Sequence, residues 1–140
     1  MVKQGLIDST YKFQPRQIVC LEHETTCLYA EVIEFVELRQ VCWLRPLMLT
    51  VTPVNNELVL TASPESVLLY NLRQGPDLLL PVRLLRLALD TEVIPLLVGL
   101  EDPLYESVNN VESHHQLSYF ISKVWRTYPK EFESQRELNS

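Results

Sequence analysis

The segment CLYAEVIEFVELRQVCWLRPLMLTV, residues 27–51, constrains the fold more than any other part of the chain. It is rich in Val, Ile, Tyr, Phe and Trp, which favour the pleated, half-buried surface of a β-strand. The apolar pattern breaks only at residues 37–40. We therefore predict two strands joined by a hairpin at that break.

The first of these two strands is apolar on both faces. Successive side chains of a strand point to opposite sides, so the sequence divides into two sets. One face is expected to carry Leu28, Ala30, Val32 and Val36. The other face is expected to carry Tyr29, Ile33 and Phe35, together with Glu31 and Glu37. A strand of this kind lies between two layers, so we expect it to be covered on its second side by a helix or a partner.

Shorter strands are predicted on either side of this hairpin. FQPRQIVCLEHE, residues 13–24, has β-branched residues after a proline, and Glu24 to Thr26 then form a loop. NNELVLTA, residues 55–62, and SVLLYNLR, residues 66–73, follow later, the second before a QGPD turn. About five short strands between residues 16 and 74 favour a small antiparallel barrel or sandwich.

Two helices are predicted after Gly75. The first is capped by Asp90 or Thr91 and runs to about Leu100, with Pro95 in or just beyond its first turn. The second lies in NNVESHHQLSYFISKVWRTYP, where Pro129 ends it. Its apolar residues recur at spacings of three and four: Leu117, Phe120, Ile121, Val124, Trp125 and Tyr128.

The net charge of −6 disfavours nucleic acid as the main partner, because a nucleic-acid-binding protein must neutralise several phosphates. Nucleic-acid binding is kept as an alternative, for which the positive contacts are Arg39, Arg45, Arg73, Arg83 and Arg86. The first residues lack the apolar core of a signal peptide, and no uninterrupted apolar stretch is long enough for a membrane span. We expect a cytoplasmic protein without a membrane span.

A metal site is a second alternative, with Cys20, His23, Cys27 and Cys42 as candidate ligands. Their spacing lacks the paired C-x2-C pattern of recognisable zinc sites. In a straight strand, Cys20 and His23 also point to opposite faces. Free cysteine is among the most buried residue types, so we expect buried, reduced thiols and neither metal nor cofactor.

Catalytic residues are not predicted. The chain has only three glycines and contains neither a serine elbow nor a glycine-rich phosphate loop. We therefore expect that the protein is not an enzyme.

Candidate partner-binding residues lie on the central strand pair: Tyr29, Phe35, Trp43 and Arg45. Aromatic side chains and arginines are enriched at interface hot spots, so they indicate a binding face for another protein or for a second copy of the chain. The competing interpretation places at least two of the aromatic side chains in the core or under the C-terminal helix.

Residues 13–49, with their proline-led strand, short loop, LYAEVIEFV and QVCWLRPL, resemble the opening strands of SH3-like and Tudor-like small barrels. The chain is also similar to uncharacterised small cyanobacterial proteins of that kind, over residues 13–74. Where such barrels carry a glycine after the first proline, this chain has Arg16. The resemblance implies a fold and a tendency to bind proteins, and it assigns no functional residues.

We therefore predict a mainly β domain with helices (β+α). A flexible lead (1–12) precedes an SH3-like, partly open barrel (13–89), a helical extension packed on the barrel (90–129) and a frayed tail (130–140). The predicted function is a non-catalytic protein–protein interaction or regulatory adaptor domain. The alternatives are a Tudor-like or KOW-like nucleic-acid-binding barrel and a Cys/His metal-binding domain.

Overall fold

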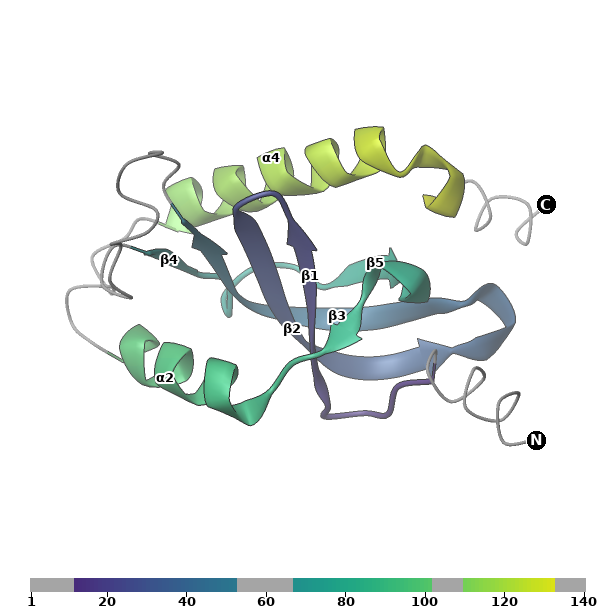
Figure 1. The fold of residues 1–140 in the computed structure, drawn as a ribbon, viewed down its shortest axis with the longest axis horizontal. Helices are drawn as coiled ribbons and strands as arrows, with labels where there is room; N and C mark the ends of the chain where they lie inside the picture. Colours follow the sequence, from purple (N-terminus) through teal and green to yellow (C-terminus); the bar gives the residue numbers. More distant parts are fainter. Residues whose placement is uncertain (1–11, 53–66, 102–109, 133–140) are drawn as a thin grey trace.

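The computed structural model describes residues 12–52, 67–101 and 110–132 (Figure 1). Its elements are β1 (Ile18–His23), β2 (Thr26–Val36), η1 (Glu37–Arg39), β3 (Val41–Val51), β4 (Leu68–Asn71), β5 (Leu78–Pro81), η3 (Val82–Leu84), β6 (Arg86–Leu87), α2 (Asp90–Leu100) and α4 (Asn110–Thr127). This confirms the β+α class and the hairpin at 37–40. The predicted strand at 55–62 and most of the predicted lead and tail lie outside the described residues.

The strands form one antiparallel sheet in the order β4-β3-β2-β1-β6. The long strand β3 has two partners on its other side: residues 41–44 pair with β5, and residues 48–51 pair with β4. Among the described strands, no pairing joins β6 back to β4 or β5, so the sheet is open there.

Two irregularities interrupt the pairing of β2 with β3, one between Tyr29 and Ala30 and one between Val32 and Glu34. At the second, Ile33 has no partner in β3, and such an extra residue reverses the alternation beyond it. Phe35 consequently packs against the same apolar cluster as Val32. The expectation that Phe35 shares a face with Tyr29 is therefore wrong.

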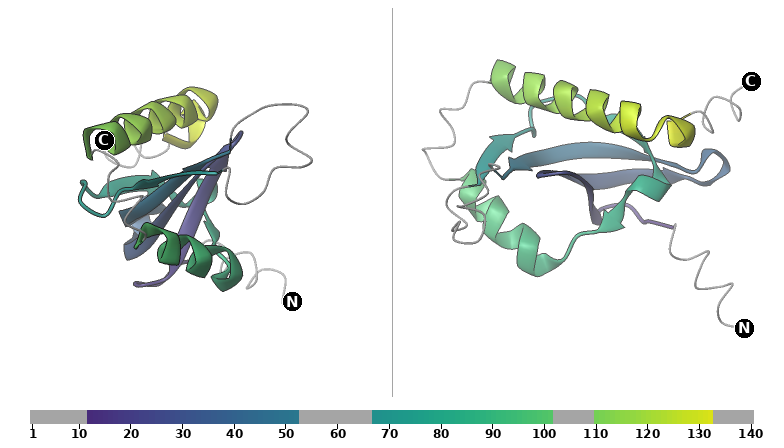
Figure 2. Two further views of the ribbon diagram at one scale, coloured as in Figure 1. Left: turned by 90° about the vertical axis from the view of Figure 1, so that its left-hand side faces the viewer. Right: turned by 45° about the horizontal axis from the view of Figure 1, so that its top comes forward.

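The sheet lies between the two helices, with α4 over one face and α2 over the other (Figure 2). On the α4 side, Leu117, Phe120 and Val124 pack against the inward side chains of β1, β2 and β3. On the α2 side, Val93 and Leu100 belong to a second, smaller cluster. The two-sided apolar pattern of β2 is thus explained by two helices of the same chain.

Helix α2 does not begin with the predicted cap. Leu89 is its N-cap residue, and the Leu89 backbone N–H donates to Oε1 of Glu92 at 2.8 Å. Pro95 lies inside the helix. The outward residues Ile94 and Val98 are exposed, so α2 is apolar on its solvent side as well.

Helix α4 is amphipathic, as predicted, and one further helical turn follows it at residues 129–132. Phe132 in this turn is buried in the α4-side core and lies beside Trp125. The expectation that the frayed tail begins at Lys130 is therefore wrong, because Phe132 belongs to the core. Among the described residues, neither helix is long and apolar enough to cross a membrane.

Arg16 has a left-handed backbone conformation, with φ of 77°. This region favours glycine, because it brings the Cβ atom of other residues close to the backbone. The backbone N–H of Arg16 donates to the carbonyl oxygen of Val32 at 2.8 Å, and that bond ties the lead into β1 to β2. The chain thus keeps a glycine-like turn at Arg16 without a glycine.

Candidate functional site

The four predicted binding residues are divided between the core and the surface. Tyr29 is buried under α2, and Phe35 packs against the α4-side core. Trp43 and Arg45 lie on the same face of β3 and are both exposed. The competing interpretation, in which two of the aromatic side chains belong to the core, is therefore confirmed for Tyr29 and Phe35.

Trp43 is held at the surface by β2 and β5, which pair with it through Glu34 and Leu79. Its side chain points away from α4, since its neighbours Cys42 and Leu44 pack on the α4 side. The indole Nε1–H donates to Oδ2 of Asp77 at 2.9 Å, and 41% of the residue remains exposed. The ring is therefore fixed in orientation and yet accessible.

Asp77 also lies near the second exposed residue of this face. Its Oδ1 atom is 3.7 Å from Nε of Arg45. One carboxylate thus fixes the indole of Trp43 by a hydrogen bond and lies within ion-pair distance of Arg45.

A groove of about 530 Å³ adjoins this pair, and we call it the Trp43 groove. It is lined by Val36, Arg39, Trp43, Asp77, Leu78 and Leu79. Its walls therefore combine aliphatic side chains, one indole and opposite charges. Leu79 is half exposed, so apolar surface continues from the groove onto β5.

Arg39 gives the groove an unusual polar feature. Its Nε atom is buried and has no hydrogen-bond partner among the described residues. A buried donor left unpaired costs roughly 1–3 kcal/mol, and a guanidinium is well suited to pair with a carboxylate. The groove therefore presents a cationic donor that lacks an acceptor.

A second polar cluster joins the sheet to α2. The hydroxyl of Tyr29 donates to Oε2 of Glu92 at 3.0 Å. Arg86 donates to Oε1 of Glu92 at 2.8 Å and to Oε1 of Glu22 at 2.6 Å. Hydrogen bonds from Arg86 lower the pKa of Glu92 to about 2, while burial raises the pKa of Tyr29. These groups satisfy one another and anchor the helix.

The four candidate metal ligands do not converge. Cys20 and Cys27 lie on the α2 side of the sheet, whereas Cys42 lies in the α4-side core, where burial raises its pKa to about 11. His23 is beside α4, with its ring 6.0 Å from that of Tyr128. In the part of the chain that the structure describes, no group of three or more His, Cys, Asp or Glu side chains is placed to hold a metal ion.

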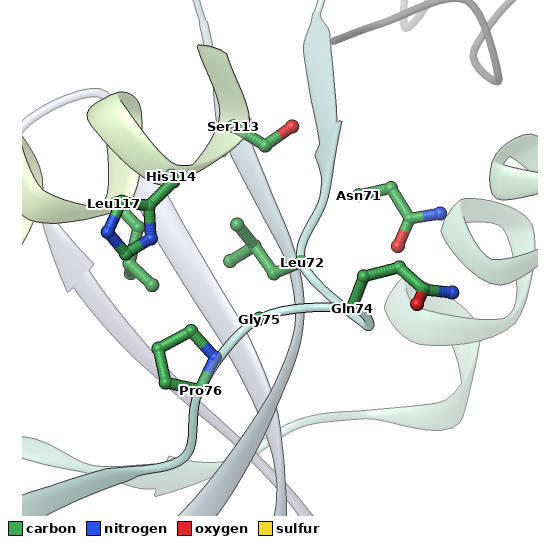
Figure 3. A pocket seen from close by; sticks show the side chains of 8 residues that line it. All are labelled: Asn71, Leu72, Gln74, Gly75, Pro76, Ser113, His114 and Leu117. Carbon is green, nitrogen blue, oxygen red and sulfur yellow. The ribbon is translucent and has the colours of Figure 1, made fainter. Parts of the chain in front are cut away.

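A separate pocket of about 360 Å³ lies between α4 and the turn after β4 (Figure 3). Its apolar wall is formed by Leu72, Pro76 and Leu117, with Ser113 and His114 from α4 beside them. The Ser113 hydroxyl is buried and has no partner among the described residues, so it does not form a nucleophile–base pair with His114.

Several residues that line the Trp43 groove are missed by reasoning from the sequence. Arg39 was considered only as a nucleic-acid contact, and Asp77 and Leu79 lie more than 30 positions after Trp43 in the chain. The pairing of β5 with the first half of β3 brings them together. No local sequence signal marks that pairing.

Comparison with protein-family models, with curated proteins and with solved structures finds no match to this chain.

Proposed function

We propose that this chain is a non-catalytic protein-interaction domain whose Trp43 groove binds a segment of a partner protein. The segment carries a carboxylate next to an apolar side chain. The observation that carries the proposal is that the guanidinium of Arg39, whose Nε has no hydrogen-bond partner among the described residues, lines the same groove as the exposed ring of Trp43.

The apolar half of the recognition comes from Trp43 and Leu79. Tryptophan and arginine are the residue types that most often dominate interface energetics. The hydrogen bond from Trp43 to Asp77 fixes the ring before binding, which reduces the entropy lost on association. An aliphatic or aromatic partner side chain would cover the exposed part of the ring and the neighbouring leucine.

The charged half comes from Arg39 and Arg45. A partner carboxylate that enters the groove would pair with the Arg39 guanidinium that lines it, and a charge-assisted hydrogen bond is about twice as strong as a neutral one. Asp77 already lies near Arg45, so Arg39 is the stronger candidate for the incoming acid. Asp77 would also repel an acid placed directly against it, which favours one orientation of the segment.

The alternative of nucleic-acid binding has less support. Arg73 pairs with Glu101, Arg86 pairs with Glu22 and Glu92, and Arg45 lies near Asp77. Three of the five arginines proposed for phosphate contacts therefore already have carboxylate neighbours, and the net charge of the chain is −6.

We also propose that the open sheet is a variant of the SH3-like small barrel. The resemblance of the sequence of residues 13–49 to the opening strands of such barrels supports this proposal.

A selection from random displayed peptides tests the proposal. The full chain is the bait, and the enriched peptides are synthesised and titrated against the chain by isothermal titration calorimetry, which needs no indole reporter. We expect enriched peptides to combine Asp or Glu with an apolar neighbour. Their affinity should fall at least about tenfold in Trp43→Ala and in Arg39→Met, as at interface hot spots.

Tyr119→Ala, an exposed aromatic on α4 outside the groove, is the matched control and should leave affinity unchanged. Peptides without acidic character, or equal binding to the Arg39→Met variant, would overturn the proposal. Light scattering tests whether a second copy of the chain binds in the groove. A dimer that the Trp43→Ala substitution dissociates would show that the groove binds another copy of the chain and not a partner protein, and would overturn the proposal.

A further inference from the structure

Cys20 and Cys27 are neighbours on the α2 face of the β1–β2 hairpin. Cys20 pairs with Tyr29, and Cys27 pairs with Glu22, so the two cysteines are diagonal across adjacent strands. Both belong to the apolar cluster that seats α2. Diagonal neighbours in an antiparallel pair have Cα atoms roughly 7–8 Å apart and Cβ atoms somewhat closer. The two thiols therefore occupy one site.

The two thiols differ in access and in their hydrogen-bonding roles. Cys20 is buried, whereas Cys27 is partly exposed. Hydrogen bonding with the Cys20 thiol lowers the pKa of Cys27 against the opposing effect of burial. The pKa of Cys20 is raised by its bond to Cys27 and by burial. Of the two thiols, Cys27 therefore loses its proton more easily, and Cys20 is the donor.

Charged neighbours define the rest of the site. Arg86 is the cross-strand partner of Cys20 on β6, and its positive charge favours a thiolate at Cys27. Glu22 opposes that effect, but Arg86 binds its carboxylate at 2.6 Å. A partly exposed thiol with a neighbouring thiol donor and a nearby cation has the surroundings of a reactive cysteine.

We propose that Cys27 is a modification site at which a hydroperoxide oxidises the thiolate to a sulfenic acid. The sulfur attacks one peroxide oxygen, a sulfur–oxygen bond forms and the oxygen–oxygen bond breaks. The sulfur loses two electrons, and the other oxygen leaves as hydroxide or alkoxide and takes a proton to become water or an alcohol. The donor Cys20 remains beside the product.

Oxidation adds a polar oxygen to the apolar cluster beneath α2. We expect α2 to be held less firmly after the reaction.

The test exposes the reduced full-length chain to hydrogen peroxide in the presence of dimedone, which traps sulfenic acids, and maps the adduct by peptide mass spectrometry. We expect the adduct on Cys27, formed at least about tenfold faster than any adduct on the buried Cys42. Oxidised protein should also exchange backbone amides faster over residues 90–100. An adduct confined to Cys42, or no adduct at all, would overturn the proposal.

Two variants separate the proposed site from general thiol exposure. Cys20→Ala removes the donor and should slow labelling of Cys27 several-fold, whereas Cys42→Ala, on the opposite face of the sheet, should leave it unchanged. Labelling of Cys27 that is equally fast in Cys20→Ala would show that the donor plays no part. Circular dichroism of each variant confirms that the comparison is made between folded proteins.

Discussion

The hydroxyl of Tyr29 on β2 donates a hydrogen bond of 3.0 Å to Oε2 of Glu92 on α2, across 63 positions of the chain. This bond, with those from Arg86 to Glu92, joins the sheet to a helix that otherwise rests on a small apolar cluster. The orientation of α2 therefore depends on one phenol, one guanidinium and one carboxylate.

Removing the hydroxyl of Tyr29 should lower the stability of the protein, because the junction between β2 and α2 loses one hydrogen bond. Tyr29→Phe loses one hydrogen bond to a charged group, and Arg86 still pairs with the carboxylate, so we expect a loss of roughly 1.5–3 kcal/mol in the free energy of unfolding. Urea denaturation measures it. Tyr70→Phe, in the α4-side cluster, is the control and should cost less. Equal losses would mean that the Tyr29 bond adds nothing specific.

Stability should fall in acid because of Glu92. Its pKa is about 2 in the folded protein and 4.5 ordinarily, so the stabilisation is complete above about pH 4.5 and is lost as the pH falls toward 2. At 1.36 kcal/mol per pH unit the difference corresponds to roughly 3 kcal/mol. About 2 kcal/mol of this difference is lost between pH 6 and pH 3, because the pKa of the folded state lies below pH 3. Urea denaturation at these two pH values should show that loss in the wild type and a smaller one in Glu92→Gln. Identical pH dependence in both would contradict the assignment.

Arg39 should separate stability from binding. Arg39→Met removes a buried donor without a partner and keeps much of the aliphatic stem, so we expect the free energy of unfolding to stay the same or rise by about 1 kcal/mol. The same variant should lose affinity for the selected peptides. A thermal melt and a peptide titration on one preparation give both results; a strongly destabilised variant would indicate a structural role instead.

Arg16 offers a stabilising substitution. Its φ of 77° costs a side-chain-bearing residue roughly 1–2 kcal/mol relative to glycine. We expect Arg16→Gly to raise the melting temperature, and Arg16→Ala, which keeps the strained backbone and removes only the long side chain, not to raise it. A gain in both variants would attribute the effect to the arginine side chain.

Truncation of two adjacent aromatic residues of α4 should change the free energy of unfolding by very different amounts. Phe120 is buried in the α4-side core and Tyr119 is 62% exposed. Phe120→Ala should cost roughly 3–5 kcal/mol through lost contacts and a cavity, while Tyr119→Ala should change stability by less than about 0.5 kcal/mol. Similar values from chemical denaturation would mean that α4 is not seated as described.

Local patterns predicted most of the elements. The β-branched and aromatic content of residues 27–51 predicts β2, β3 and their hairpin, and the spacing of Leu117, Phe120 and Val124 predicts α4 and its buried side. These features arise within one element, from alternation along a strand or the repeat of a helix. Sequence alone is sufficient for them.

The sequence alone does not predict on which face of β2 the side chains beyond Ile33 lie. Nothing in EVIEFVE marks Ile33 as the extra residue, because the irregularity depends on how β2 meets β3. Phe35 was therefore assigned to the wrong face. The same limit applies to the candidate site, where the sequence predicts an accessible Trp43 but leaves open whether Tyr29 belongs to the core or to a binding face.

The sequence by itself determined that this chain has a β-rich core with an amphipathic C-terminal helix, because periodicity records which side of each element avoids water. Only the tertiary structure decided that two helices of the chain cover the sheet and that β5 brings Asp77 and Leu79 to Trp43. Contacts between distant segments depend on register and packing, and these are set by all the elements together.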